Sequence, residues 1–352
     1  MVDKISAADS IQSAREAHLS YVDDSKPGIT RRHKGKRFIY FNERGKQIRD
    51  PKIIARINHL VIPPAWKEVW ICPRQNGHLQ ATGRDVRGRK QYRYHVRWRE
   101  TRDETKYEHI ISFGRALPKI RRRVVRDLTH HGLPREKVLA TVVRLLETTL
   151  IRVGNDEYAR TNHSYGLTTM HNRHVDIHGS KVTFNFRGKS GKKHVIDVEN
   201  QKLAKIVRRC LHLPGYELFQ YVDSDGKPVN VTSSDINEYL HEITKADFTA
   251  KDFRTWAGTV LAARALQEFQ KFTSDTEAKR NVVSAIEAVS KMLGNTPAIC
   301  RKCYIHPTVL NTYLDGSLVK RLKKKAESKL AKSLHSLRPE EGAVLMLLQQ
   351  TL

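Results

Sequence analysis

The spacing of apolar residues divides the chain into two parts of different character. From Phe38 to Trp98, short β-type runs such as FIYF at 38–41 and YRYHVRW from Tyr92 are separated by glycine and proline. One helical stretch, PKIIARINHL, lies among them. Short runs bounded by turn residues are typical of strands. The pattern predicts a β-rich domain over residues 37–102, preceded by a polar, basic, loosely ordered arm over residues 1–36.

The polar run RETRDETK, residues 99–106, predicts a linker, and helical spacing dominates after it. Apolar residues between positions 137 and 154 recur at helical intervals, and FRTWAGTVLAARALQEF and NVVSAIEAVSKML predict two more helices. KVTFNF and HVIDV flank the turn RGKSGKK and predict a hairpin. We expect an α+β protein whose larger domain, residues 103–316, is mainly helical with one small sheet. A basic helical tail over residues 317–352 completes it.

The charge of the chain predicts a polyanionic partner. Among 352 residues, 64 Lys and Arg oppose 37 Asp and Glu, which leaves a formal net charge of +27. A field of this sign attracts phosphates, so nucleic acid is the first expectation and a membrane surface the second. No run reaches the roughly 20 apolar residues of a membrane span, and the N-terminus lacks the apolar core of a secretory signal. We therefore expect a cytoplasmic protein.

Cysteine usage and the known cofactor motifs predict neither a metal nor a cofactor. The chain has 4 cysteines, too few and too scattered for a disulfide framework. Cys300 and Cys303 form a lone C-x-x-C, and no second pair lies nearby to complete a zinc site. The sequence also lacks a P-loop, a nicotinamide fingerprint and an acidic metal-binding cluster.

The richest basic segment, Arg84 to Arg99, interleaves seven Lys or Arg residues with aromatic ones. On a strand, Gln91 and Arg93 would lie on one face while Tyr92 lies on the other. Gln and Arg are side chains that reach base edges in a major groove, so the segment predicts DNA contact. The alternative is a basic, solvated face over a buried row of tyrosines.

Four later segments each hold a polar residue where an active site would need one. Arg152 follows a long amphipathic helix, and Lys189 lies at the tip of the predicted hairpin. In TAKDFRTWAG, a capping box places Arg254 in the first turns of a helix. In LGNTPAICRKCY, a glycine ends one helix and a Thr-Pro pair opens the next, just before Tyr304.

Taken in order, these segments resemble the type IB DNA topoisomerases, specifically the poxvirus-like and bacterial branch. The motifs are GRDVRGRKQYRYH, LIRVGNDEYARTN, YGLTTM, FRGKSGKKH, KDFRTWAGT and LGNTPAICRKCY. The resemblance implies a tyrosine recombinase/topoisomerase IB-like catalytic fold, with Arg152, Lys189, Arg254 and the nucleophile Tyr304 in the active site. Asn295 occupies the position where the family usually has histidine. An amide can donate a hydrogen bond to a phosphate oxygen, but it cannot exchange a proton.

The chemistry of these residues suits a reversible attack on a phosphodiester. Tyrosine is a better leaving group than a sugar alkoxide, and arginine forks match the charge on phosphate oxygens. Lys189 is the expected general acid. The resemblance implies a 3′-phosphotyrosyl link to duplex DNA, swivelling that relaxes supercoils of both signs, and religation without ATP or metal. We expect a monomer whose domains clamp the duplex, with contacts from Lys90, Gln91, Tyr92, Tyr94, Tyr158 and Lys251.

Two other functions fit parts of the sequence. Tyrosine recombinases share the catalytic constellation, but they usually carry His three residues before the second arginine, where this chain has Lys251. Their N-terminal domains are helical, whereas this one is expected to be β-rich. A non-catalytic nucleoid protein would account for the charge alone and would form no covalent adduct. The bacterial nucleoid is the expected location of the protein.

Overall fold

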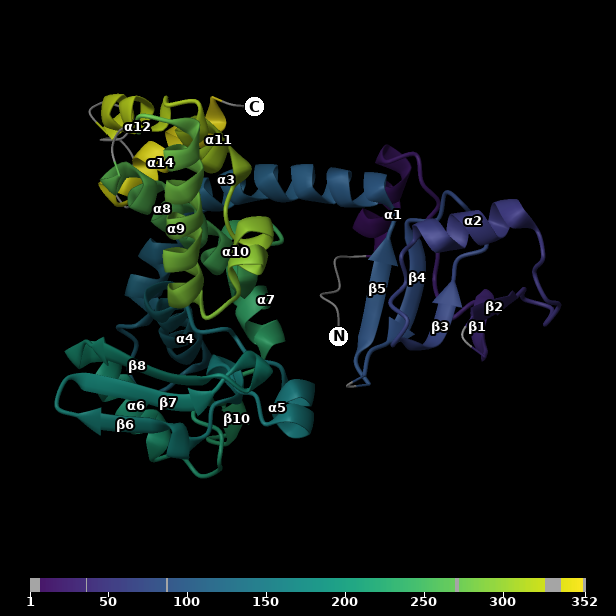
Figure 1. Cartoon of the computed structure of the whole chain (residues 1–352). Helices are drawn as coiled ribbons and strands as arrows, with labels where there is room; N and C mark the ends of the chain where they lie inside the picture. Colours follow the sequence, from purple (N-terminus) through teal and green to yellow (C-terminus); the bar gives the residue numbers. More distant parts are fainter. Residues whose placement is uncertain (1–6, 36, 87, 270–271, 327–336, 351–352) are drawn as a thin grey trace. The chain divides into compact units, whose positions relative to one another are not determined.

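The computed structural model describes residues 7–35, 37–86, 88–269, 272–326 and 337–350. The chain divides into two compact units, one up to Glu108 and one from His109 onward (Figure 1). Within the described ranges, no helix is both long and apolar enough to cross a membrane.

The N-terminal unit contains a five-stranded antiparallel sheet and two helices. Its elements are α1 (Ala7–Glu16), β1 (Ile29–Lys34), β2 (Arg37–Phe41), α2 (Pro51–His59), β3 (Lys67–Ile71), β4 (Leu79–Arg84) and β5 (Lys90–Tyr94). The strand order is β2-β1-β3-β4-β5, which leaves β2 and β5 at the edges. Asp50 caps α2 by accepting the backbone N–H of Lys52 at 2.8 Å. The predicted helix and β-rich character of this region are thus confirmed.

The prediction of a loosely ordered arm over residues 1–36 is wrong for residues 7–35, because β1 lies inside the sheet between β2 and β3; residues 1–6 and 36 lie outside the described ranges. Ile29 is buried, and Arg31 donates to the carbonyl oxygens of Pro63 at 3.0 Å and Trp66 at 2.8 Å. The Arg31 guanidinium also lies 4.2 Å from the ring centroid of Phe38. A basic run can therefore form an inner strand when its side chains find carbonyl and aromatic partners, which the local sequence does not reveal.

The predicted linker at residues 99–106 is helical, since this run lies inside α3 (Val96–Asp127), and the boundary between the two units falls just after it. The run contains neither Gly nor Pro, and its Glu, Lys and Arg residues are good helix formers. High polarity was therefore compatible with a helix that continues across the boundary between the units. The strand expected from Tyr92 to Trp98 ends at Tyr94, and α3 begins at Val96.

The C-terminal unit is mainly helical with small antiparallel sheets, as the α+β prediction requires (Figure 1). Besides most of α3, its helices are α4 (Arg135–Thr149), α5 (Asp156–Asn162), α6 (Gln201–Leu211), α7 (Ser233–Thr244), α8 (Ala250–Glu268), α9 (Asp275–Leu293), α10 (Pro297–Cys303), α11 (Pro307–Leu314), α12 (Leu318–Ala326) and α14 (Pro339–Gln349). Its strands are β6 (Val175–His178), β7 (Lys181–Arg187) and β8 (Lys193–Glu199) in one sheet, and β9 (Gln220–Val222) with β10 (Pro228–Asn230).

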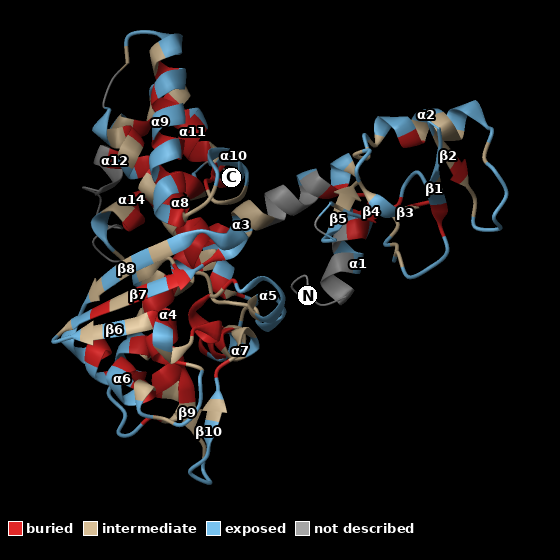
Figure 2. Ribbon diagram, turned by 60° about the horizontal axis from the view of Figure 1, so that its bottom comes forward, coloured by how far each residue is buried: buried red, intermediate tan, exposed pale blue. Residues whose placement is uncertain are grey.

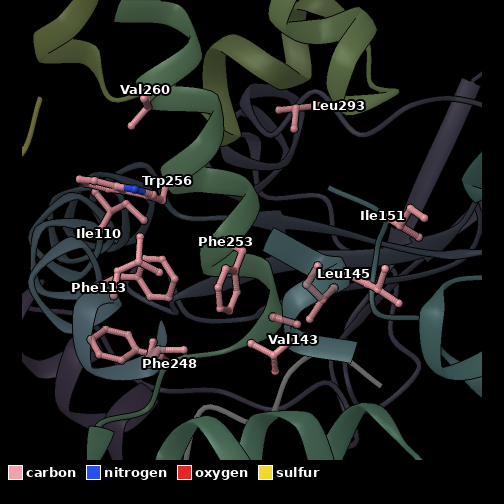
Figure 3. Close-up of a cluster of buried hydrophobic side chains, with 14 of the residues drawn as sticks. Ile110, Phe113, Val143, Leu145, Ile151, Phe248, Phe253, Trp256, Val260 and Leu293 are labelled. Carbon is pink, nitrogen blue, oxygen red and sulfur yellow. The ribbon is translucent and has the colours of Figure 1, made fainter. Parts of the chain in front are cut away.

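The core of this unit includes buried residues of α3, α4, α8 and α9, and α8 packs against both α4 and α9 (Figure 2). Phe113 of α3 meets Phe248 and Phe253 edge-on, with ring centroids 5.4 and 5.0 Å apart (Figure 3). Edge-to-face pairs at this spacing are favourable beyond the area they bury. The first turns of α8, which carry Arg254, are therefore fixed by the core.

The C-terminal tail packs on the same core through α14. Its apolar run, residues 343–348, is largely buried. Arg121 of α3 donates two hydrogen bonds of 2.8 Å to the carboxylate of Glu341 and one of 2.6 Å to Glu147. The lysine-rich part of the basic tail lies in α12 (Leu318–Ala326), whereas residues 327–336 lie outside the described residues.

Candidate active site

The core anchors the backbone at three predicted site residues. Ile151, Phe253 and Leu293 are all buried (Figure 3). Each lies one or two positions before a predicted site residue, namely the two arginines and Asn295. The positions of these polar groups are therefore set by hydrophobic packing.

Arg254 is buried, with 4% of its surface exposed, and is held by backbone carbonyls. Its Nη2 donates to the carbonyl oxygen of Leu293 at 2.6 Å, and its Nη1 donates to that of Leu150. These carbonyls belong to the C-terminal ends of α9 and α4, where backbone acceptors are free and the helix dipole is negative. The guanidinium is thus stabilised by dipoles while its full charge remains available to a substrate.

Arg152 and Asn295 are in direct contact, since Nη2 of Arg152 donates to Oδ1 of Asn295. Burial, followed by the charge of Arg254, lowers the pKa of Arg152 to about 10, so Arg152 is still protonated at neutral pH. Within the described structure, neither Nδ2 of Asn295 nor Nε of Arg254 has an acceptor, although both atoms are buried. Buried donors are normally paired, and a phosphate oxygen would supply the missing acceptor.

Tyr304 is half-buried and follows α10 as its cap, with its N–H donating to the Cys300 carbonyl at 2.9 Å. The guanidinium carbon of Arg254 lies 5.3 Å from the tyrosine ring centroid. Gly258 lies four residues after Arg254, on the same face of α8. A Cβ at Gly258 would lie 2.6 Å from the Tyr304 carbonyl oxygen, so glycine is what lets α10 approach α8 this closely.

Lys189 lies in the turn between β7 and β8, so the predicted hairpin is confirmed. The N–H of Gly188 donates to the Lys192 carbonyl at 2.8 Å and closes the turn. The exposed Lys189 side chain lines one pocket together with Arg152 and Arg254. Among the described residues that line this pocket, none is acidic. The structure thus places all five predicted catalytic residues in one cluster.

The YGLTTM motif supports the segment that carries Arg152. The N–H of Leu167 donates to the Arg152 carbonyl at 2.9 Å, and that of Thr168 donates to the Val153 carbonyl at 2.6 Å. A Cβ at Gly166 would lie 2.5 Å from the Arg152 carbonyl oxygen. Two motifs that are separate in the sequence therefore form one local structure.

The sequence analysis missed one residue of this pocket, His194 on β8. Burial alternates along β8, which puts His194 on the same inward face as Ile196 and Val198. Burial, followed by the charges of Arg152 and Arg254, lowers the pKa of His194. The sequence did contain a signal for this residue. His194 lies on the apolar side of the predicted strand that follows the turn with Lys189.

The predicted DNA contacts of the N-terminal unit lie on the edge strand β5. Lys90 forms an ion pair of 2.6 Å with Asp24, and Gln91 donates to Asp85 at 3.1 Å. The rings of Tyr92 and Tyr94 stack with centroids 5.9 Å apart. Their contact with DNA stays a prediction.

The two other predicted contacts belong to the C-terminal unit, and both side chains are exposed. Tyr158 lies on α5, and Lys251 lies in the first turn of α8, three residues before Arg254. Their contact with DNA is also untested.

Cys300 and Cys303 are unbridged residues of α10. In the described ranges, no group of three or more His, Cys, Asp or Glu side chains is arranged to hold a metal ion.

Comparison with known proteins matches both units. A family model described as the catalytic core of eukaryotic DNA topoisomerase I matches residues 95–333, and one described as the N-terminal domain of bacterial DNA topoisomerase IB matches residues 37–85. DNA topoisomerase 1B of Acanthamoeba polyphaga mimivirus is 33% identical over 293 residues, which cover 81% of this chain and 87% of that protein. DNA topoisomerase 1B of Vaccinia virus (strain Copenhagen) is 22% identical over 265 residues, covering 74% and 80%. The chain belongs to the type IB DNA topoisomerase family.

Proposed function

We propose that this protein relaxes supercoiled duplex DNA by cutting and resealing one strand, with Tyr304 as the nucleophile. The observation that carries the proposal is the cluster around Tyr304. Arg254 lies 5.3 Å from its ring, Arg152 and Asn295 are hydrogen-bonded to each other, and the pocket that the two arginines share has no acidic lining among the described residues. Such a cluster is complementary to one phosphate group.

Each residue has a distinct part in the proposed reaction. The Tyr304 oxygen attacks phosphorus, the bond to the 5′ oxygen breaks, and the 3′ phosphate stays on the tyrosine. Arg152 and Arg254 stabilise the negative charge on the non-bridging oxygens, and Nδ2 of Asn295 donates to one of them. Lys189 gives a proton to the departing 5′ oxygen. The reverse steps religate the strand.

The phosphotyrosyl link keeps the broken phosphodiester in an activated form, so the cycle needs no ATP. Arg152 and Arg254 supply the positive charge that a metal ion would supply in other phosphoryl-transfer sites. The intact strand acts as a swivel while the free end turns, which removes supercoils of either sign.

We further propose that a monomer holds the duplex, with each unit contributing part of the contact surface. The contacts would come from Lys90, Gln91, Tyr92, Tyr94, Tyr158 and Lys251. The match of residues 37–85 to a bacterial domain supports a place on the bacterial chromosome.

Trapping the covalent intermediate tests this function. Supercoiled plasmid is incubated with the purified protein in EDTA without ATP, and the reaction is stopped with denaturant. We expect relaxed topoisomers and a DNA adduct that maps to the peptide containing Tyr304. Tyr304→Phe should abolish both while duplex binding persists.

Tyr216→Phe is the matched control, because Tyr216 is 81% exposed and does not line the pocket. A covalent adduct in the Tyr304→Phe protein would exclude Tyr304 as the nucleophile. Recombinant products from paired sites, without relaxation, would instead indicate a recombinase. Binding with neither adduct nor relaxation in the parent protein would indicate a non-catalytic DNA-binding protein.

A further inference from the structure

The ring of His194 occupies the space between two glycine backbones in the active site. A Cβ built at Gly188 would lie 2.7 Å from Cδ2 and 2.8 Å from Nε2 of this ring, and one at Gly294 would lie 2.8 Å from Cε1. The Nε2 edge of the imidazole is therefore in contact with both segments. Gly188 directly precedes Lys189, and Gly294 directly precedes Asn295.

The two glycines are needed for different reasons. Gly294 has φ +61° at the end of α9, in the left-handed region where glycine is favoured. Gly188 has φ −94° and ψ −165°, which any residue adopts. At position 188, the close approach of the His194 ring is what leaves no room for a side chain.

The ring is also held from its other side. His194 pairs in register with Phe186 of β7, and the two rings stack with centroids 5.2 Å apart and planes 23° apart. Phe186 is itself buried. Because the pKa of His194 is lowered, the imidazole is neutral at pH 7 and adds no charge to the cationic pocket. The neutral ring of His194 is therefore held between Phe186 of β7 on one side and the backbones of Gly188 and Gly294 on the other.

We propose that His194 is a positioning residue that sets the spacing between the Lys189 turn and the Asn295 segment, and so places the lysine at the departing 5′ oxygen. The inference rests on the proposed function, in which Lys189 is the general acid. A displacement of about 1 Å at such a group is enough to lower a rate by about 10²-fold. The side chain acts through Lys189 and transfers no proton itself.

A change of leaving group separates this role from general support of the fold. The test compares single-turnover cleavage of an ordinary duplex with that of a duplex carrying sulfur in place of the bridging 5′ oxygen at the scissile phosphate. Thiols are far more acidic than alcohols, so sulfur leaves as thiolate without a proton from Lys189. Lys189→Ala should cleave the ordinary duplex slowly and should cleave the sulfur-containing duplex at close to the parental rate.

His194→Ala should behave in the same way, with cleavage slowed about 10²-fold on oxygen, recovery on sulfur and unchanged duplex affinity. His194→Phe keeps a flat ring between the glycines and should cleave ordinary DNA within about tenfold of the parent. The control is His178→Ala, on strand β6 of the same sheet, where the imidazole is 81% exposed. Thermal unfolding of each variant verifies the fold.

A second comparison tests the contact itself. Gly188→Ala places a methyl group in the space of the ring and should slow cleavage of ordinary DNA. If the defect arises from this contact, the double variant Gly188→Ala/His194→Ala should cleave no more slowly than His194→Ala alone. The effects of substitutions at two residues in direct contact are not additive.

Three results would overturn the proposal: cleavage of ordinary DNA by His194→Ala at the parental rate, additive losses in the double variant, or a His194→Ala defect that persists on sulfur while Lys189→Ala recovers. Failure of Lys189→Ala to recover on sulfur would instead contradict the general-acid role of lysine in the proposed function. The double variant would then still decide whether His194 sets the spacing.

Discussion

At the scale of single residues, the sequence predicted side chains that the structure brings into one cluster, but it did not predict which contacts hold them there. The resemblance supplied Arg152, Arg254 and Tyr304 because each lies in a distinctive local motif. It did not show that Arg254 donates hydrogen bonds to backbone carbonyls at two helix ends, nor that His194 lies between two glycines. These contacts join segments far apart in the chain, which local patterns do not encode.

Asn295 occupies the position where the resemblance leads us to expect a histidine, and its proposed contribution is measurable. Asn295→Ala removes the unpaired donor Nδ2, so we expect a loss of roughly 2–4 kcal/mol of transition-state stabilisation in single-turnover cleavage. Asn295→Asp retains an acceptor for Arg152 but has no donor, and it should be at least as slow. Parental rates in both variants would show that this position takes no part in cleavage.

At the scale of helices and strands, periodicity and caps predicted the hairpin at Lys189, the helices around Arg254 and the break before Tyr304. These are local signals, and each was confirmed. The arm was predicted wrongly over its described residues because polar side chains in it find partners elsewhere, and the helix across residues 99–106 was not expected from so polar a run. Arg31 in β1 finds carbonyls more than thirty positions away.

The place of β1 inside the sheet leads to a truncation experiment. Deletion of residues 1–34 removes the strand between β2 and β3 and exposes the buried faces of both neighbours. We expect rapid hydrogen exchange throughout residues 37–94, with protection retained in the C-terminal unit. Deletion of residues 1–6 is the control and should leave exchange unchanged. Native protection after the longer deletion would mean that β1 is dispensable.

The contact between α3 and α14 gives a prediction that depends on pH. Burial opposes ionisation of Glu341, but its hydrogen bonds with Arg121 outweigh this effect and lower the pKa of Glu341. The ionised pair therefore stabilises the fold at neutral pH, and the benefit is lost as pH falls through the ordinary Glu value toward the lowered one. Glu341→Gln should reduce the free energy of unfolding by about 3 kcal/mol at pH 7.

The difference between Glu341→Gln and the parent should shrink in denaturation curves measured below about pH 4. If the difference in free energy of unfolding between Glu341→Gln and the parent stays constant from pH 7 to pH 3, the ionised pair does not stabilise this contact.

At the scale of the whole molecule, the net charge of +27 predicts binding that depends steeply on salt. If the two units together meet 6–10 phosphates, the duplex affinity of Tyr304→Phe should fall by about 10³–10⁵ between 50 and 200 mM salt. Lys251→Ala should flatten the logarithmic slope by about one, as the loss of one phosphate contact requires. An unchanged slope would remove Lys251 from the DNA interface.

Because none of the described residues lining the pocket is acidic, the positive charge of Arg152 lowers the free energy of unfolding of the protein without DNA. The lowered pKa of Arg152 shows that its ionised form is disfavoured in the folded state, so at neutral pH this charge opposes folding. Arg152→Met should therefore raise the melting temperature while abolishing cleavage, and a melting temperature below that of the parent would contradict this expectation. Selection for stability alone would remove the arginine, which makes this site an example of activity maintained against stability.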